Sequence, residues 1–346
     1  MLPGVLRIGK TRIDPVVRTD SYEIHIKRDD RIFFSQGTKI RKLFGIYESL
    51  LPSIESGLCK KVLLQGNLHS NAILAGVLFF RHVGVPTKVL GYSRDGNLVS
   101  PASLVARRFS ELELYPSRKE WERAVEDTTK VSLSLNQLHL NENSTDNAAR
   151  NLDRTSLESK LSTRNLNSTP SRWDDKAENP NSSGDLLLPE YFFCQESLNG
   201  LSSLWEEIDP NSFDHVVLDV GSGLTWLSAI LWGKLPITGI CLGLNREKTV
   251  LWLQENLSSL RQTLPSLAWN SLVEPKDKLR LSFSFGKKDG FWEEKAREYE
   301  RKFGIYLEPI YSAKTFSVLE EMAKSDELNG RILYVYQGGI LQGMNL

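Results

Sequence analysis

The segment Gly221–Thr225, which reads Gly-Ser-Gly-Leu-Thr, has the residue types of a phosphate-binding loop. It directly follows the apolar run His215–Val220 and precedes a segment that we expect to be helical. Glycine lets a backbone approach an anion closely, and the free N–H groups at a helix start favour phosphate. Ser222 and Thr225 add hydroxyl donors. The same turn is also common as a plain connection from strand to helix, so this second interpretation stays open.

A second segment, Gly66–Asn71, also lies between an apolar run and an expected helix. Ser70 and Asn71 are residue types that cap helix N-termini, and capping is one interpretation of their presence. The other interpretation is that they hold a carboxylate or a ring hydroxyl at that terminus. His69 beside them is interpreted as a packing or surface residue and not as a base.

Lys39 and Lys42 lie three residues apart in the segment Gly37–Lys42. Basic residues on one helical turn are typical of a solvated face, which is the first interpretation. Lys39, however, follows a glycine turn at which a helix is expected to begin, and both the positive helix end and a second lysine lower a lysine pKa. A lysine with a lowered pKa is what Schiff-base chemistry requires.

The segment Glu308–Lys314 is expected to end a short strand at Pro309. That arrangement leaves Tyr311 and Ser312 at the C-terminal mouth of the strand. Ligands bind on this side in open α/β sheets, so these two residues join the candidate site.

Short apolar runs alternate with helix-like segments on both sides of a polar tract. The expected strands cover residues 61–64, 87–92, 215–220, 237–244 and 331–336, and the expected helices cover 71–82, 225–232 and 291–303. Strands that are apolar on both faces and alternate with helices imply parallel sheets covered by helices. We therefore predict an α/β fold with two sheets.

The tract from Asn136 to Gly184 holds nine Asn and eight Ser but one aromatic residue, Trp173. Such a composition cannot bury enough apolar surface to offset the entropy of ordering. We interpret this tract as a disordered insert or a long linker.

Taken in order, these segments resemble the pyridoxal-phosphate (PLP) enzymes of the 1-aminocyclopropane-1-carboxylate (ACC) deaminase and D-cysteine desulfhydrase family. Lys27–Asp30 and Gly37–Leu43 resemble the family motifs K-R-[DE]-D and G-N-K-x-R-K-L. Gly66–Asn71 resembles G-G-x-Q-S-N, and Glu308–Lys314 resembles D-P-V-Y-x-x-K. Gln337–Gly339 resembles a near-terminal x-G-G, and the likeness spans nearly the whole chain apart from the insert.

The resemblance implies a fold type II PLP enzyme, similar to the tryptophan synthase beta chain, with two domains of three-layer, open twisted α/β sheets. It implies PLP between the domains, a small amino-acid substrate and a homodimer. On this basis we expect four segments. They are 1–48 as the first part of a large cofactor domain, 49–135 as a small domain, 136–184 as the insert, and 185–346 as the rest of the large domain.

The resemblance also implies roles for individual residues. Lys39 would form the Schiff base and act as the base at the substrate Cα. Ser70 would meet the substrate carboxylate, Asn71 the ring hydroxyl of the cofactor, and Tyr311 would face the substrate. The other implied cofactor contacts are Lys42, Gly221, Ser222, Gly223, Leu224, Thr225, Ser312 and Gln337.

Several positions depart from the family pattern. Phe285 and Ser312 stand where deaminases carry a second tyrosine and a glutamate, and Tyr191 and Phe192 stand where the family has Gly-Gly. With Ser312 or Gln337 in place of a carboxylate, we expect a less strongly protonated ring nitrogen. These departures favour a D-cysteine desulfhydrase-like β-elimination, giving pyruvate, ammonia and sulfide, over opening of the cyclopropane ring. Further departures are Thr38, Asn67, His69, Ala72 and Leu224.

Composition excludes several other classes of protein. The 43 basic and 43 acidic side chains balance, which gives no electrostatic reason to expect nucleic acid or a membrane surface as a partner. The apolar run Ala72–Phe80 is far shorter than the ~18–20 residues that a membrane span needs. Cys59, Cys194 and Cys241 show no metal-ligand spacing, so we expect no metal and a cytoplasmic protein.

Two alternative functions stay open at this point. His215–Thr225 also fits the first motif of an S-adenosylmethionine methyltransferase, although the next strand lacks an acidic residue at its end until Glu247. The other alternative is a catalytically impaired protein that keeps the PLP fold and ligand binding without turnover, which the loop substitutions favour.

Overall fold

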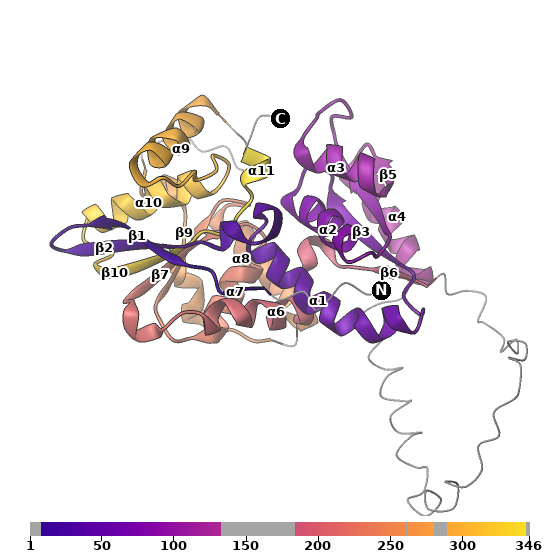
Figure 1. Cartoon of the computed structure of the whole chain (residues 1–346), viewed down its shortest axis with the longest axis horizontal. Coiled ribbons are helices and arrows are strands. Elements are labelled where there is room, and N and C mark those ends of the chain that lie inside the picture. Colours follow the sequence, from indigo (N-terminus) through magenta and orange to yellow (C-terminus); the bar gives the residue numbers. More distant parts are fainter. Residues whose placement is uncertain (1–7, 133–183, 261, 280–288, 344–346) are drawn as a thin grey trace, which may run out of the picture.

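The computed structural model describes residues 8–132, 184–260, 262–279 and 289–343, which form two sheets lying side by side (Figure 1). The predicted insert lies outside the described residues except for Gly184, and Phe285 lies outside them as well. Within the described part of the chain, no helix is both long and apolar enough to cross a membrane.

The larger sheet has six strands. In spatial order these are β1 (Ile13–Arg18), β2 (Tyr22–Lys27), β10 (Gly330–Val335), β7 (His215–Val220), β8 (Ile237–Cys241) and β9 (Leu272–Val273). β1 runs antiparallel to β2, and the other neighbouring pairs are parallel.

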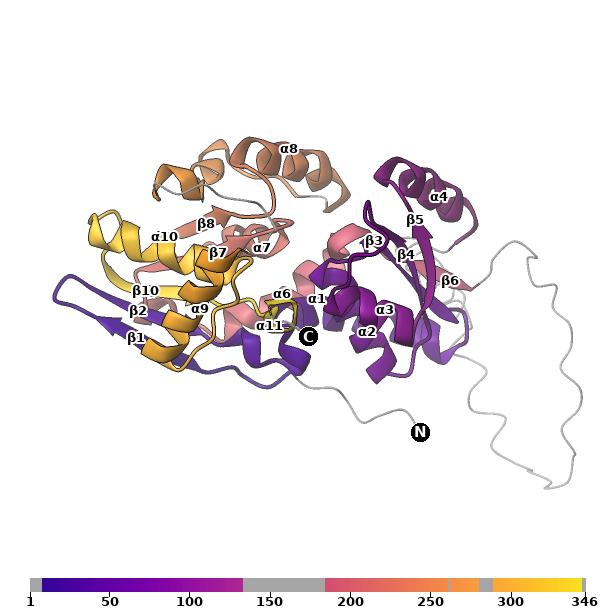
Figure 2. The ribbon, with the colours of Figure 1, turned by 90° about the horizontal axis from the view of Figure 1, so that it is seen from above.

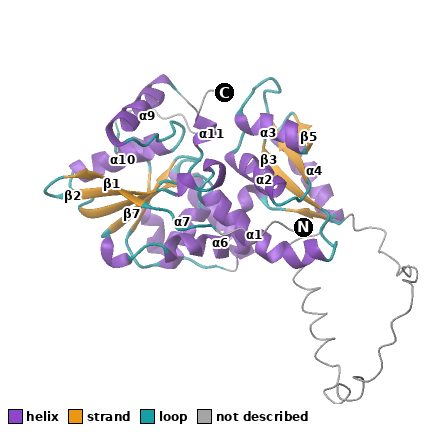
Figure 3. Cartoon of the chain, in the orientation of Figure 1, coloured by secondary structure: helices purple, strands orange, loops and turns teal. Residues whose placement is uncertain are grey.

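Helices cover both faces of this sheet because successive strand residues point to opposite sides (Figure 3). In β7, Val217 packs into a core with α9 and α10, whereas Leu218 packs into the other core with α6 and α7. The helices of this part of the molecule are α1 (Thr38–Glu55), α6 (Gln195–Glu206), α7 (Leu224–Trp232), α8 (Arg246–Leu257), α9 (Gly290–Phe303), α10 (Ser312–Lys324) and α11 (Ile340–Gly343).

The smaller sheet has four parallel strands. In spatial order they are β5 (Glu111–Tyr115), β4 (Thr87–Tyr92), β3 (Lys61–Asn67) and β6 (Asp185–Leu187). Val89 of β4 packs with α2 (Asn71–His82), while Leu90 packs with Trp121 of α4 (Arg118–Val131) on the opposite face. The third helix, α3 (Pro101–Phe109), lies beside α2 (Figure 2).

Helix α1 lies between the two sheets and packs tightly against α6 (Figures 1 and 2). The crossing needs glycine on both helices. A Cβ at Gly45 would come within 2.2 Å of the Glu196 carbonyl oxygen, and a Cβ at Gly200 within 2.1 Å of the Arg41 carbonyl oxygen. The backbones are therefore in direct contact, and α1 is a fixed element between the sheets.

The predicted α/β class with parallel sheets is confirmed, and helices at 71–82 and 291–303 are present as expected. Two expectations are wrong. β6 pairs with β3, so the boundary at residue 185 assigned this strand to the wrong sheet. No strand precedes Pro309, because the Glu308 carboxylate accepts hydrogen bonds from the backbone N–H groups of Ile310, Tyr311 and Ser312 and folds the segment into a turn.

Candidate active site

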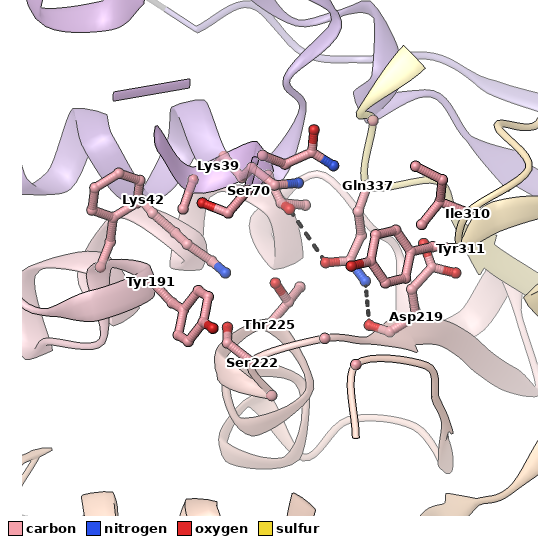
Figure 4. Close-up of a pocket in the computed structure, with 18 of the residues that line it drawn as sticks. Lys39, Lys42, Ser70, Tyr191, Asp219, Ser222, Thr225, Ile310, Tyr311 and Gln337 are labelled. Atoms are coloured by element: carbon pink, nitrogen blue, oxygen red, sulfur yellow. Dashed lines mark hydrogen bonds between the residues drawn. The ribbon is translucent and has the colours of Figure 1, made fainter. Parts of the chain in front are cut away.

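A cavity of about 300 Å³ is lined by residues from both parts of the molecule (Figure 4). All of the predicted site residues line it except Leu224 and Ser312. They come from the start of α1, the start of α2, the turn between β7 and α7, and the C-terminal segments. Tertiary structure therefore brings together motifs that lie up to about 300 positions apart in the chain.

Lys39 lies in the first turn of α1 and lines the cavity. The helix starts at Gly37, where φ is 56° and a Cβ would come within 2.1 Å of the Gln337 carbonyl oxygen, so glycine is required there. Burial lowers the pKa of Lys39, and the nearby carboxylates of Asp219 and Glu308 oppose that shift. The main cause of the lowered pKa of Lys39 is thus burial, whereas the sequence suggested the helix end and the charge of Lys42.

Lys42 lies one helical turn further along α1 and is also buried in the cavity wall. Burial lowers its pKa to about 7, and the charge of Lys39 adds to the effect. Lys39 and Lys42 therefore do not form a solvated basic face. Both lysines line the cavity.

Ser70 and Asn71 open helix α2 at the cavity. The Ser70 hydroxyl oxygen accepts a hydrogen bond from the Ile73 N–H at 3.2 Å, as an N-cap residue does. Its hydroxyl proton is still available to an acceptor in the cavity. The Asn71 Oδ1 atom is buried and has no hydrogen-bond partner. The capping interpretation is confirmed for Ser70, and because Ser70 and Asn71 also line the cavity, the second interpretation stays a prediction.

His69 lines the same cavity. Its ring nitrogens each lie 2.9 Å from a serine hydroxyl, Ser93 on one side and Ser100 on the other. Burial lowers the pKa of His69, which favours the neutral ring. The two hydroxyls hold the ring in a fixed orientation at the cavity wall.

The predicted phosphate loop forms the turn from β7 into α7. Gly221, Ser222, Gly223 and Thr225 line the cavity. Gly223 is the N-cap of α7 with φ of 87°, in the left-handed region that favours glycine. Leu224 differs, because its side chain is fully buried in the hydrophobic core, and it can offer the cavity only its backbone.

Tyr311 lines the cavity, whereas the neighbouring Ser312 does not. The Ser312 side chain is fully buried, and its Oγ atom lies 3.4 Å from both Asp219 Oδ2 and Glu308 Oε1. Burial raises the pKa of the Glu308 carboxyl to about 7. The Glu308 carboxylate thus holds the backbone of Tyr311 and Ser312 through their N–H groups, and the Ser312 side chain lies away from the cavity.

Gln337 faces the cavity, but its amide group is already held on both sides. Its Nε2 donates to the Asp219 carbonyl oxygen at 2.6 Å, and its Oε1 accepts from the Thr38 hydroxyl at 3.3 Å (Figure 4). These bonds join the C-terminal segment to β7 and to the start of α1.

Asp219 is a cavity residue that was not predicted for the site. It interrupts the apolar strand β7 two residues before the glycine turn, and this position is the signal that could have identified it. Burial raises its pKa to about 6.

Three larger side chains that line the cavity, Tyr191, Trp252 and Arg118, were also not predicted for the site. Tyr191 lines the cavity and contacts the ring of Trp252 edge-on at 6.1 Å, and the Trp252 Nε1 donates to the Ser222 carbonyl oxygen at 3.1 Å. Arg118 lines the cavity from the start of α4 and forms ion pairs with Glu122 at 2.9 Å and Glu190 at 3.5 Å. Aromatic residues at the family Gly-Gly position were the available signal.

The residues present fit PLP. The unpartnered Oδ1 of Asn71 is suited to a ring hydroxyl, and the glycine-lined loop at the start of α7 is suited to a phosphate. Lys39 and Lys42 supply amino groups with lowered pKa values at the same cavity. In the described part of the chain no group of three His, Cys, Asp or Glu side chains could hold a metal ion.

Known proteins resemble this chain in part of its sequence and in its fold. No family model matches the chain. Two proteins named putative ACC deaminase, from Pyrococcus furiosus and Pyrococcus horikoshii, are each 31% identical to it over 137 and 136 residues. Those stretches are 37% of this chain and 40% of each relative, so the chain matches well under half of the length of these relatives.

Solved structures resemble nearly the whole chain. An ACC deaminase homologue covers 97% of this chain and 91% of its own, with a TM-score of 0.64 and 19% identity. A hydrogen sulfide-producing enzyme from Fusobacterium nucleatum matches 96% of this chain and 94% of its own, with a TM-score of 0.52 and 11% identity. A PLP-dependent aspartate racemase matches 95% and 90%, with a TM-score of 0.54 and 9% identity. The chain therefore has the fold type II architecture of PLP enzymes, and part of its sequence is similar to putative archaeal ACC deaminases.

Proposed function

We propose that this chain binds PLP through Lys39 and acts as a lyase or deaminase on a small amino acid. One observation carries the proposal. Lys39, the Ser70–Asn71 helix start and the Ser222–Thr225 loop come from three distant segments and line one cavity. The deaminase name of the two archaeal relatives supports the same reaction class.

Bound PLP would supply an electron sink for the bond broken at the substrate Cα. Lys39 is suited to remove the Cα proton, because burial lowers its pKa and a general base works best with a pKa near the working pH. The Ser70 hydroxyl and the N–H groups at the start of α2 would hold the substrate carboxylate. Lys42 and the hydroxyls of Ser222 and Thr225 would hold the phosphate.

Within this class we propose β-elimination from D-cysteine or a related β-substituted amino acid. Ser312 stands where deaminases of the resembled family carry glutamate, and its hydroxyl is buried outside the cavity. That position therefore offers no carboxylate to the cavity. The likeness in fold to a hydrogen sulfide-producing enzyme agrees with this choice.

The first prediction concerns Lys39. The purified protein with added PLP should absorb in the region of about 410–430 nm, and borohydride should attach the cofactor to the peptide that contains Lys39. Lys39→Ala should abolish this absorbance and lower turnover by roughly three orders of magnitude or more, because both the covalent link and the base are lost. Weak PLP binding should remain, since the phosphate loop lies on another segment.

Lys42→Ala is the matched control, because it removes a lysine from the same helix face. It should alter activity and affinity but keep the covalent link to Lys39. A label on any other lysine, or an unchanged spectrum in Lys39→Ala, would contradict the proposal and return attention to the methyltransferase alternative. Covalent PLP without turnover of any amino acid would instead favour the catalytically impaired binding protein. The similar proteins named above favour neither alternative.

The second prediction concerns the substrate. Pyruvate release from D-cysteine should be faster than 2-oxobutyrate release from ACC at equal enzyme and substrate concentration. Coupled dehydrogenase assays measure both products. A faster reaction with ACC would reject the desulfhydrase assignment while keeping the PLP enzyme.

The resemblance also leads us to propose a homodimer and a cytoplasmic location. Light scattering on the purified, PLP-loaded protein tests the first of these. A monomer under those conditions would remove the dimer from the proposal without affecting the site, since all of the residues named for it lie on one chain.

A further inference from the structure

Asp219 is a buried carboxylate on the cavity wall that the proposed chemistry has not used. It is 9% exposed and lies near the carboxyl end of β7, two residues before the phosphate loop. An ionisable group in an otherwise apolar strand costs stability unless something compensates for its burial. Because Asp219 lines the cavity, its carboxylate is within reach of a ligand bound there.

Neighbouring side chains hold the Asp219 carboxylate in place. The Tyr334 hydroxyl donates to Oδ1 at 3.0 Å, and the Ser312 hydroxyl approaches Oδ2 at 3.4 Å. The Thr315 hydroxyl also lies close to the carboxylate and lowers its pKa. The two carboxylate oxygens together have four lone pairs, so three neutral donors leave capacity for a further donor. The carboxylate is therefore oriented by the protein but not saturated.

The cavity has two chemically different ends. Figure 4 shows Lys42, Tyr191, Ser222 and Thr225 on one side and Tyr311, Gln337 and Asp219 on the other. The first side carries the groups suited to a phosphate. In PLP the ring nitrogen lies opposite the carbon that joins a lysine, so a molecule held by the phosphate loop and Lys39 turns its nitrogen toward the second side.

The two residues expected near that nitrogen are engaged elsewhere. Ser312 does not line the cavity, and its hydroxyl faces Asp219 and Glu308. The Gln337 amide is held by the Asp219 carbonyl and by Thr38. Glu308 does not line the cavity either, and its carboxylate accepts three backbone N–H groups. Asp219 is the carboxylate that lines the cavity among the described residues.

We propose that Asp219 is the partner of the PLP ring nitrogen and keeps that nitrogen protonated. This inference rests on the proposed function, because it requires PLP in the cavity. An acidic partner makes the ring a stronger electron sink. The proposal reverses the expectation, drawn from Ser312 and Gln337, of a less strongly protonated nitrogen. The proposed partner of the ring nitrogen therefore lies on β7, the strand that precedes the phosphate loop. The glutamate of the deaminases stands instead at the position of Ser312.

The test uses the full chain loaded with PLP labelled with 15N in its ring. The 15N chemical shift distinguishes a protonated from an unprotonated ring nitrogen directly and does not depend on turnover. At pH 8 the unsubstituted protein should give the protonated signal, and Asp219→Asn should move it to the unprotonated position. Glu308→Gln removes a neighbouring buried carboxyl that does not line the cavity, so this control should keep the protonated signal.

Asp219→Ser serves as a second neutral variant if Asp219→Asn fails to fold, and it should give the same shift. A protonated signal that persists in a folded Asp219 variant would overturn the inference, as would an unprotonated signal in the unsubstituted protein. Loss of the protonated signal in Glu308→Gln would also overturn it, because general charge and not contact would then be responsible. Failure of the proposed function is a different result, in which borohydride attaches no PLP to Lys39.

Discussion

Tyr191 and Phe192 have φ angles of 58° and 60°, in the left-handed region that aromatic residues rarely adopt. They come directly after Pro189-Glu190, and they stand at the two positions where the resembled family has Gly-Gly. Glycine adopts this conformation without strain, whereas each aromatic residue costs roughly 1–2 kcal/mol there. The chain tolerates this strain beside its cavity, which is where backbone strain is commonly kept for function.

The third prediction compares Tyr191 with Phe193. Both rings contact Trp252, at 6.1 and 6.0 Å, but the backbone of Phe193 has an unstrained φ of −82°. Tyr191→Gly should lower the free energy of unfolding by about 1–2 kcal/mol, because relief of the left-handed strain offsets part of the lost ring contacts. Phe193→Gly has no such relief and should cost about 3 kcal/mol or more.

Urea denaturation of both variants measures the difference. Equal losses would show that Tyr191 carries no recoverable strain. PLP titration of Tyr191→Gly then shows separately whether the ring that lies near Ser222 affects affinity.

At the scale of elements, helix α1 positions Lys39 and is itself held by the α1 charge cluster, which consists of Lys27, Asp29, Arg41 and Glu207. Arg41 binds Asp29 through Nε at 2.7 Å and Glu207 through Nη2 at 2.8 Å. Lys27 of β2 also forms an ion pair with Glu207, which follows α6. Lys27, Asp29 and Arg41 are fully buried. The Lys27–Asp30 motif thus connects β2, α1 and the end of α6, next to the glycine crossing of α1 and α6.

The fourth prediction concerns this cluster. Asp29→Asn should lower the free energy of unfolding by about 3–5 kcal/mol, because it leaves buried cations without full compensation. Glu294→Gln breaks the exposed pair with Arg301, at 2.7 Å, and should cost no more than about 1 kcal/mol. Chemical denaturation followed by tryptophan fluorescence gives both values. Similar costs for the two variants would contradict the assigned importance of burial.

At the scale of the whole molecule, the cavity depends on how two separate sheets are placed around α1 (Figure 2). The smaller sheet receives β6 only after the chain has passed through the Asn/Ser-rich tract, and β6 pairs with the central strand β3. Its first residues are anchored, since the Lys60 N–H donates to the Gly184 carbonyl oxygen at 2.7 Å. The cavity residues all lie outside residues 136–183.

The fifth prediction follows from that division. Replacing residues 136–183 with a short Gly/Ser bridge should leave the melting temperature and PLP binding nearly unchanged, because the tract has too few apolar residues to form a core. Gly184 stays in place so that β6 keeps its anchor. Differential scanning fluorimetry with and without PLP checks the result. An insoluble product, or one without a melting transition, would show that the tract is structural.

Local pattern was sufficient for the α/β class and for most helices and strands. It also singled out the segments around Lys39, Ser70 and Ser222, although it left a purely structural interpretation of each open. These features depend on hydrophobic period, capping residues and glycine turns, all of which act between neighbours in the chain. Tyr311 was placed at the site by a motif, although the strand expected before it is a turn made by the Glu308 carboxylate.

Tertiary packing alone decided which of these side chains face the cavity. Leu224 and Ser312 were predicted site residues but are buried away from the cavity, while Asp219, Tyr191 and Arg118 line the cavity and were not predicted as site residues. The strand pairing of β6 with β3 and the environment that lowers the pKa of Lys42 to about 7 likewise join residues far apart in the sequence. Side-chain direction, burial and charge–charge distance are properties of the packed whole, and a periodic pattern contains none of them.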